Sequence, residues 1–415
     1  MKVLILCDKW GALGGKEQTT LDCVEGLKAR GHECVVVYES VTDKPWAAGI
    51  AEGVRLYPVP ALSKYVDSQD ARHAEDLRKV LDREGPDVIL LRDVLNLRML
   101  RVLIDYGRIL AIAQNCRIFC LRESKTFYFS KKPCERKLGA GCLLHGCFLR
   151  KNAGSLRRGL RYNSLRQLMR VATLYQEIRY HVVDSHYMRG VFLQHGFRAD
   201  QVEVIGSFAD VSVARDGHRE DRTPNILFLG RIDRYKGVDY LLRALSKLEA
   251  TFTCTIVGDG PYLPLCRRLC RRLGLNGVVR FTGWVARDLT SDYLQAASIA
   301  VVPSIWPEEF GRVGIEAMAH AKPVVAFDNG GISDWLHHGK TGYLVPSKDI
   351  TGLARRIEEL LRNPRLAREF GAAGRQVVVT KFNRDAFFER LIGALERASE
   401  GPGGSTPGNL HDRQV

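Results

Sequence analysis

The chain has 415 residues and a formal net charge of +15 at pH 7, with 45% hydrophobic and 26% charged residues. This length exceeds what one ordinary hydrophobic core supports, so we expect two domains, and the composition is typical of a soluble globular protein. No apolar run approaches the roughly 20 residues that span a bilayer, and Met1–Cys7 is too short for a signal-peptide core, so we expect a cytoplasmic protein.

The N-terminal residues predict a strand, a glycine-bearing turn and a helix. Lys2–Cys7 is an apolar run, and Glu17–Arg30 places its leucines on one face before a second strand at Glu33–Tyr38. Gly14 and Gly15 lie in the turn, where glycine either lets the backbone approach a ligand or serves as a plain turn residue. The full G-x-G-x-x-G spacing of dinucleotide-binding proteins is absent.

Basic charge is concentrated in one segment. Residues 121–170 contain thirteen Lys or Arg against two Glu, which attracts phosphate-bearing partners such as anionic lipid, a diphosphate-linked acceptor or nucleic acid. Within this segment, Ser155–Met169 sets leucines among arginines and predicts a basic amphipathic helix. Such a helix either lies on an anionic membrane or packs on a core with a solvated basic face.

Residues 125–165 form an insertion that follows a strand expected at Arg117–Leu121. Zinc sites use Cys and His at short spacings, but the spacings here match no closed zinc pattern and leave a structural role as the alternative. The residues concerned are Cys134, Cys142, His145 and Cys147. Because the eleven cysteines are odd in number and the chain is long, we expect reduced thiols.

A second α/β domain is predicted after a polar, unpatterned stretch at residues 211–223. Its first strand, Asn225–Leu229, is followed by Gly230 and by a tight turn bracketed by Arg231 and Lys236. Two cations at the carboxyl end of a strand can converge on a diphosphate, or they can be plain surface charges.

The next strand, Thr253–Val257, ends in a Gly-Asp-Gly turn. Gly258 and Gly260 would let the backbone lie against a flat base or a ribose, because glycine has no side chain to keep a ligand away.

Strand, helix and strand follow one another between residues 300 and 345, with the helix beginning near Gly311. Glu308 lies on the turn before this helix and Glu316 lies within it, so both carboxylates can reach one pocket at the carboxyl ends of the strands. The helix N-terminus between them suits phosphate. The alternative is that both are ordinary surface charges.

These residues resemble a known family. The motif residues Pro303-Ser304, Glu308, Phe310-Gly311, Glu316-Ala317 and Gly330-Gly331 are similar to the E-x7-E signature of glycosyltransferase family 4, the group 1 glycosyl transferases. The resemblance implies an α/β protein of GT-B fold, in which two Rossmann-like, doubly wound parallel-sheet domains face a cleft. It also implies a retaining enzyme that uses a nucleotide sugar.

The resemblance assigns roles to residues of the second half. Arg231 and Lys236 would neutralise the diphosphate leaving group and Glu308 would hold sugar hydroxyls, so these three are the catalytic candidates. Glu316 would hold the ribose hydroxyls. The other donor-binding candidates are Gly230, Gly258, Gly260, Phe310, Gly311 and Arg312.

The resemblance also divides the chain. We expect an acceptor-binding domain at residues 1–210, a linker at 211–223, and a donor-binding domain at 224–381. A terminal helix at residues 382–400 would cross back to the first domain, before a disordered tail at 401–415.

The acceptor side departs from the family, which often carries a histidine after the strands of the first domain. This chain has Arg92-Asp93 and Arg122-Glu123 there. Arg122 and Glu123, together with the turn residues Gly14 and Gly15, are the acceptor-side candidates, and a surface ion pair is the alternative for Arg122 and Glu123.

We therefore predict a metal-independent hexosyltransferase, because the sequence contains no Asp-x-Asp pair and cations are available for the leaving group. It would need no cofactor, would use a UDP- or GDP-linked sugar, and would act on a glycan or lipid-linked acceptor of cell-surface polysaccharide or lipopolysaccharide. An anionic membrane surface is an expected partner and nucleic acid is not. The alternatives are an epimerase of GT-B layout and a catalytically silent membrane- or nucleic-acid-binding module.

Overall fold

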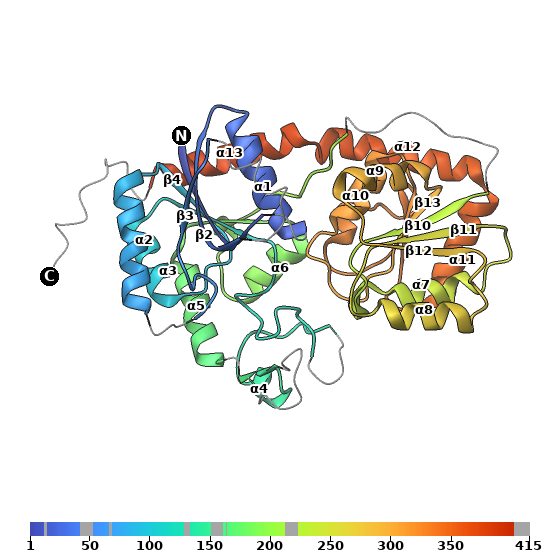
Figure 1. Ribbon diagram of the computed structural model, residues 1–415, viewed down its shortest axis with the longest axis horizontal. Coiled ribbons are helices and arrows are strands. Elements are labelled where there is room, and N and C mark those ends of the chain that lie inside the picture. The colour runs from blue at the N-terminus through green and yellow to red at the C-terminus, as the bar shows by residue number, and fades with distance from the viewer. Residues whose placement is uncertain are drawn as a thin grey trace. The chain divides into compact units, whose positions relative to one another are not determined.

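The computed structural model describes residues 1–11, 15–41, 53–65, 69–127, 133–150, 161–162, 164–211 and 223–401. The chain divides into two compact units, shown in Figure 1. Unit 1 comprises Met1–Asp184, Arg189–Ile205 and Phe388–Val415, and unit 2 comprises Ser185–Met188 and Gly206–Phe387. Most of the stretch expected to be a linker, and residues 402–415 of the expected tail, lie outside the described residues.

Unit 1 is built on a parallel sheet with the strand order β3-β2-β1-β4-β5-β8-β9. Its strands are β1 (Lys2–Trp10), β2 (Glu33–Val41), β3 (Arg55–Pro58), β4 (Val88–Leu91), β5 (Ile109–Ala113), β8 (Tyr180–Val183) and β9 (Val202–Val204). Its helices are α1 (Gly15–Lys28), α2 (Asp70–Glu84), α3 (Leu97–Tyr106), α4 (Gly141–Leu144), α5 (Leu165–Glu177) and α6 (His186–Gln194), the last of which begins in unit 2.

Helices cover both faces of this sheet, so its central strands are continuous apolar runs. All four residues of β4 are fully buried. Helices α2, α3 and α5 pack in succession on one face, and α1 lies on the other face against the last helix of the chain (Figure 1). The side chain of Asn96 caps α3 by accepting hydrogen bonds from the amides of Arg98 and Met99.

Two expectations for unit 1 are wrong. Arg117–Leu121 is a series of turns, and the strand lies earlier, at β5, because Ile109–Ala113 pairs with β4 and β8. The apolar residues of Arg117–Leu121 are buried by ring packing instead; the ring of Phe119 lies 4.8 Å from that of Phe192.

The helix expected at Ser155–Met169 begins at Leu165. It is preceded by β7 (Arg161–Tyr162), which pairs antiparallel with β6 (Leu149–Arg150). The side chain of Ser164 caps the helix through the amide of Gln167. Residues 155–160 and 163 lie outside the described residues.

Unit 2 repeats the architecture of unit 1 with the parallel order β12-β11-β10-β13-β14-β15. Its strands are β10 (Asn225–Leu229), β11 (Thr253–Val257), β12 (Val279–Gly283), β13 (Ile299–Val302), β14 (Val324–Phe327) and β15 (Gly342–Val345). Its helices are α7 (Val238–Leu245), α8 (Leu263–Arg272), α9 (Arg287–Ala296), α10 (Arg312–Ala319), α11 (Ile350–Arg362) and α12 (Pro364–Lys381).

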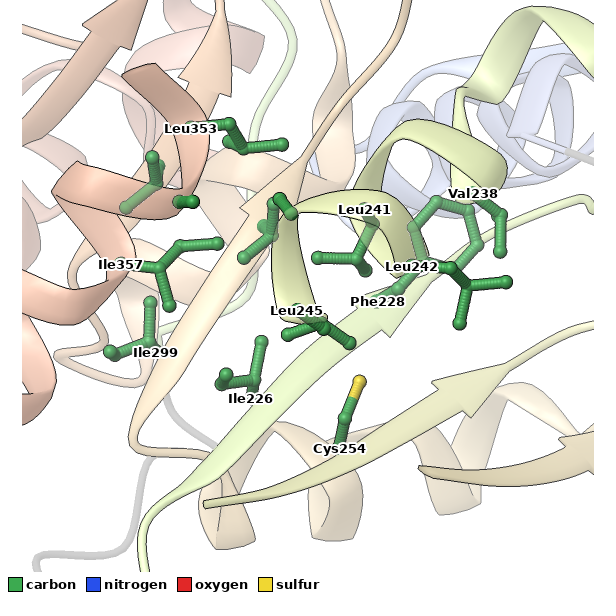
Figure 2. Close-up of a cluster of buried hydrophobic side chains, with 14 of the residues drawn as sticks. Ile226, Phe228, Val238, Leu241, Leu242, Leu245, Cys254, Ile299, Leu353 and Ile357 are labelled. Atoms are coloured by element: carbon green, nitrogen blue, oxygen red, sulfur yellow. The ribbon is translucent and has the colours of Figure 1, made fainter. Parts of the chain in front are cut away.

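Two apolar layers hold the helices of unit 2 to its sheet. Figure 2 shows the layer in which α7 and α11 pack on β10, β11 and β13, with Leu241, Leu245 and Ile357 fully buried or nearly so. The opposite layer joins α10 and α12 to the other face of the sheet. Because both faces are covered, the sheet presents its polar residues at the ends of its strands.

The last helix, α13 (Arg384–Ser399), belongs to both units, since unit 2 ends at Phe387 and the remainder of the helix lies in unit 1. In unit 1, the guanidinium carbon of Arg30 lies 4.6 Å from the ring centre of Phe388. Arg397 forms an ion pair of 2.5 Å with Glu203. Among the described residues, no helix combines the length and the apolar character needed to cross a lipid bilayer.

Candidate active site

The sheet of unit 2 reverses its strand order between β10 and β13. In open α/β sheets, ligands bind at the carboxyl ends of the strands beside such a reversal, because the two loops diverge there and leave a crevice. The loops concerned run from Gly230 to Gly237 and from Pro303 to Gly311. They contain all three residues that the sequence proposes as catalytic.

Lys236 and Glu308 meet at this point. The Lys236 Nζ donates a hydrogen bond of 2.6 Å to Glu308 Oε1, and the Ser304 hydroxyl donates to the same oxygen. The side chain of Glu308 is 6% exposed and that of Lys236 is 31% exposed. The structure therefore brings two predicted residues together and leaves the Lys236 side chain partly exposed.

Each charge of this pair stabilises the other. Burial on its own would raise the pKa of Glu308, but the adjacent ammonium group of Lys236 holds it below its ordinary value. Burial on its own would lower the pKa of Lys236, and the Glu308 carboxylate raises it. Both groups are charged at neutral pH, so the site holds a fixed carboxylate beside a fixed cation.

The β10 turn is positioned by its own residues and by the neighbouring loop. Asp233 Oδ1 accepts hydrogen bonds from the amides of Tyr235 (2.8 Å) and Lys236 (3.1 Å). The Tyr235 carbonyl accepts from the amide of Ile305 at 2.8 Å, which links the turn to the loop after β13. Gly237 has φ +71, and a Cβ there would lie 1.8 Å from the Pro303 carbonyl oxygen, so only glycine allows this approach.

The predicted glycines also meet. A Cβ on Gly258 would lie 1.9 Å from the carbonyl oxygen of Gly230, and one on Gly260 would lie 2.3 Å from that of Ile232. Hydrogen bonds join the same turns, since the amide of Ile232 donates to the Asp259 carbonyl at 2.8 Å. The carboxyl ends of β10 and β11 thus form a surface of exposed backbone with little side-chain cover.

Arg231 is exposed at the carboxyl end of β10, and its side chain has no hydrogen-bond or ion-pair partner among the described residues. A guanidinium group without an internal partner is available to an anionic ligand.

Helix α10 begins directly after Gly311, whose φ of +89 requires glycine. On its first turns, Arg312 Nε lies 3.9 Å from Glu316 Oε1, and the Glu316 side chain is 31% exposed. Glu308 and Glu316 are therefore each associated with a different cation. The ring of Phe310 is buried in the core, 5.6 Å from the ring of Phe382, and so helps to hold the loop in place.

Two contacts of this site were missed in the sequence. Ser304 positions the Glu308 carboxylate, and the Asn329 amide group donates a hydrogen bond of 2.6 Å to the Ser304 carbonyl. The sequence offers a weak signal for Ser304, four residues before Glu308, and none for Asn329, which comes from the next strand.

The described acceptor-side candidates of unit 1 come from two separate segments. Gly14 lies outside the described residues, and Gly15 is the first residue of α1. Glu123 has φ +64, and its Oε2 lies 3.8 Å from Arg117 Nε. Arg122 is half-buried. Because Arg117–Leu121 is not a strand, Arg122 and Glu123 lie in a turn region that follows β5.

A polar network at the strand-order reversal of unit 1, between β1 and β4, was not predicted. Arg117 Nη1 donates a hydrogen bond of 3.0 Å to Asp8 Oδ2 of β1. The Asn115 side chain bridges the network, since its Nδ2 donates to Asp93 Oδ1 at 2.7 Å and its Oδ1 accepts from the Arg117 amide at 2.9 Å. Asp93 has φ +52, a conformation rare outside glycine.

The cysteine-rich insertion has no metal-binding arrangement in the part that the structure describes, where no three His, Cys, Asp or Glu side chains converge. All eleven cysteines are described, and the structure places none of them in a disulfide. Cys142 and Cys147 pack with Leu168 of α5 in a small apolar cluster. Their role in the structure is therefore in packing.

Two family models cover most of the chain. The model described as "Glycosyl transferase 4-like domain" matches residues 14–208, and "Glycosyl transferases group 1" matches residues 213–377. The chain belongs to the group 1 glycosyltransferases, as the resemblance predicts, and its two parallel-sheet units have the GT-B fold.

The curated relatives align with only part of this chain and with only part of their own length. A GDP-mannose-dependent alpha-(1-6)-phosphatidylinositol monomannoside mannosyltransferase of Mycobacterium tuberculosis is 32% identical over 44% of this chain and 49% of its own length. The lipopolysaccharide core biosynthesis glycosyltransferase LpsE of Rhizobium meliloti is 29% identical over 47% of this chain and 58% of its own length. The chain thus spans about half the length of the curated relatives it matches.

A solved structure of HepE from Anabaena, in complex with UDP and glucose, is similar over 96% of this chain and 100% of that chain. Its TM-score is 0.71 and its sequence identity is 19%, so this similarity concerns the fold.

Proposed function

We propose that this chain is a retaining glycosyltransferase that moves a sugar from a nucleoside diphosphate to a glycan or lipid-linked acceptor, in the synthesis of cell-surface polysaccharide or lipopolysaccharide. One observation supports this above all others. A buried carboxylate and the ammonium group of a partly exposed lysine lie side by side where the sheet order of unit 2 reverses. A sugar diphosphate presents hydroxyl groups and negative charge at adjacent positions, and this pair complements both.

The leaving nucleoside diphosphate would be stabilised by fixed positive charge. Lys236, exposed Arg231 and the backbone amides that begin α10 can all face an anion at the same edge of the sheet. Charge develops on the diphosphate as the glycosidic bond breaks, so pre-positioned cations lower the barrier without reorganising. Lys236 can bind the phosphate while it keeps its contact with Glu308, because an ammonium group has three donors.

Glu308 would orient the sugar. Its carboxylate is held by Lys236 and Ser304, and a held carboxylate accepts hydrogen bonds from sugar hydroxyls in one geometry. Glu316, half-exposed on α10, would accept hydrogen bonds from the ribose hydroxyls. The backbone surface of Gly230, Gly258 and Gly260 would receive the flat part of the nucleoside.

The proposal requires neither a metal nor a cofactor, because Arg231 and Lys236 supply the charge that a divalent ion would otherwise provide. We expect the nucleotide of the donor to be UDP or GDP. The relatives named for GDP-mannose and for lipopolysaccharide core support a nucleotide sugar and an acceptor at a membrane. On this proposal the protein works in the cytoplasm at the inner membrane face, and unit 1 binds the acceptor near Arg122 and Glu123.

Thermal unfolding with UDP, GDP, ADP and their common sugar conjugates, in the presence of a chelator, tests the proposal. A ligand at 100 times its dissociation constant stabilises the folded state by about 2.7 kcal/mol. We expect one nucleotide sugar to give such a shift in the wild type and in Glu369→Ala, but not in Glu316→Ala.

Glu369 is a matched control, because it also pairs with an arginine four residues away on a helix of unit 2. The proposal fails if no nucleotide sugar stabilises the wild-type protein. A shift that disappears when the chelator is added would contradict metal independence.

A further inference from the structure

The short helix α4 and the first turns of α5 form an apolar surface bordered by arginines, here called the α4–α5 patch. The patch consists of Leu143, Leu144, Arg166, Met169 and Arg170. A groove of about 780 Å³ between α3, α4 and α5 runs along it, lined by Leu143, Met169 and both arginines. All of these residues belong to unit 1.

The patch exposes large apolar side chains that the fold could have buried. Leu143, Leu144 and Met169 are 47%, 83% and 47% exposed, and they are three of the eight large hydrophobic residues exposed among the described residues. Scattered exposed apolar residues are normal, but a cluster marks a surface that contacts something apolar. The clustering therefore indicates an interaction surface.

The inner side of α4 is fixed, which makes the exposure of its outer side a stable property. Cys142 and Cys147 pack with Leu168 of α5, and the Cys147 amide donates a hydrogen bond of 2.9 Å to the Cys142 carbonyl. Leu143 and Leu144 lie between these anchored cysteines in the sequence and point elsewhere. The cluster beneath them is occupied by the two cysteines and Leu168.

The charges around the patch select the partner. Arg166 and Arg170 are exposed, one helical turn apart, and Arg136 lies beside α4, where a Cβ on Gly141 would be 3.6 Å from its Nη1. The acidic residue in the groove, Glu177, is occupied by Arg101 at 2.8 Å. A surface with apolar side chains at its centre and cations around them complements anionic headgroups above an acyl layer.

We propose that the α4–α5 patch docks unit 1 on a bilayer containing anionic phospholipid, with Leu143, Leu144 and Met169 entering the headgroup region. The inference deepens the proposed function, since it assigns a surface to the membrane-facing acceptor side. Docking itself requires no nucleotide sugar. The arginines contribute long-range attraction and the apolar residues contribute burial.

Sedimentation with vesicles tests this surface in the full chain without any nucleotide. The vesicles contain phosphatidylcholine with phosphatidylglycerol, or phosphatidylcholine alone. We expect binding to the mixed vesicles and at least tenfold weaker binding to the neutral ones. Arg166→Gln with Arg170→Gln should weaken binding by about 30-fold, and Leu143→Ser with Leu144→Ser by at least tenfold.

Arg268→Gln with Arg272→Gln is the matched control, because it removes two exposed arginines at the same spacing from α8 of unit 2. The control should bind like the wild type. Equal losses in control and patch variants would overturn the proposal in favour of diffuse charge attraction. Unchanged binding by the leucine variant would overturn it too, as would a concentration-dependent dimer that the leucine substitutions dissociate.

Thermal unfolding and the nucleotide shift separate this result from the proposed function. Both patch variants should melt like the wild type and should still be stabilised by the donor. A patch variant that loses vesicle binding but still binds the donor therefore tests docking alone. A wild-type protein that binds vesicles but no nucleotide would contradict the proposed transferase activity and would still support the docking surface.

Discussion

The two units have the same kind of sheet but differ in the residues at the carboxyl ends of its strands. In unit 2 the turns at the strand-order reversal are held by glycines and backbone hydrogen bonds, and Arg231 is left free for a ligand. In unit 1 the corresponding edge is filled by charged side chains that bind one another, with Arg117 contacting Asp8 and Glu123.

This difference separates two ways of building a site. A glycine turn lets backbone approach a ligand closely, which suits a constant group such as a diphosphate. A network of side chains fixes particular carboxylates and cations, which suits recognition of one pattern of hydroxyl groups.

The largest effect on the free energy of unfolding is expected for a glycine of unit 2. Gly237→Ala should lower the free energy of unfolding by about 3–4 kcal/mol, because the new Cβ meets the Pro303 carbonyl and the backbone is left-handed. Gly274→Ala shares the left-handed φ (+70) but meets no atom within 4 Å, so it should cost about 1–2 kcal/mol. Equal losses in urea denaturation would show that close approach does not matter there.

The ion pair of unit 2 should come next. Lys236→Met leaves the Glu308 carboxylate buried without its cation, and we expect a loss of about 2–3 kcal/mol in the free energy of unfolding, reduced because Lys236 is partly exposed. Adding Glu308→Gln to this variant should recover part of the loss. If the double variant is no more stable than the single one by denaturant unfolding, the two charges are not coupled.

Unit 1 should be the more acid-sensitive partner in the comparison. Burial lowers the pKa of His181 in β8 to about 4, whereas the unfolded chain protonates this group near 6.5. The unfolded state therefore binds more protons between these values, so stability is lost as pH falls through this window, by about 2 kcal/mol between pH 7 and pH 5.

His181→Gln should reduce the slope of unfolding free energy against pH between 5 and 7, while His195, whose pKa burial also lowers to about 4, keeps a similar share of it. Glutamine can still donate to the Tyr175 carbonyl, which His181 Nε2 contacts at 3.0 Å. A variant with the full wild-type slope would assign the acid sensitivity to another group.

The smallest effect concerns the unit 1 network. Glu123→Gln keeps the shape of the side chain but removes its charge beside Arg117. We expect about a tenfold rise in KM for the acceptor, equivalent to about 1.4 kcal/mol, with donor affinity unchanged. A rise in the donor KM instead would place Glu123 outside the acceptor site.

The sequence predicts much of unit 2 and less of unit 1. The bounds of β10 and β11 agree with the predicted strands Asn225–Leu229 and Thr253–Val257, which are largely apolar runs that end at glycine, because buried parallel strands require apolar side chains on both faces. Arg117–Leu121 misled the prediction, because its apolar residues are buried in turns against other rings. Periodicity cannot distinguish these two kinds of burial.

The same limit applies to the candidate sites. The approach of Lys236 to Glu308 could be predicted, since both follow strands that neighbour each other in this topology and match a family motif. The contact between Asp8 and Arg117 spans 109 positions and follows no motif, so it requires the tertiary structure. The hydrogen bonds from Ser304 to Glu308 and from Asn329 to Ser304 likewise require the tertiary structure.

The last helix, α13, has a consequence for how the chain is made. Phe388 occupies space above Gly26, where a Cβ would lie 1.9 Å from its ring, and Leu391 and Leu395 are fully buried. Most of unit 1 is thus synthesised before unit 2 but lacks part of its core until α13 has left the ribosome. We expect nascent chains stopped before Arg384 to remain sensitive to protease in unit 1, while unit 2 can acquire most of its protection earlier.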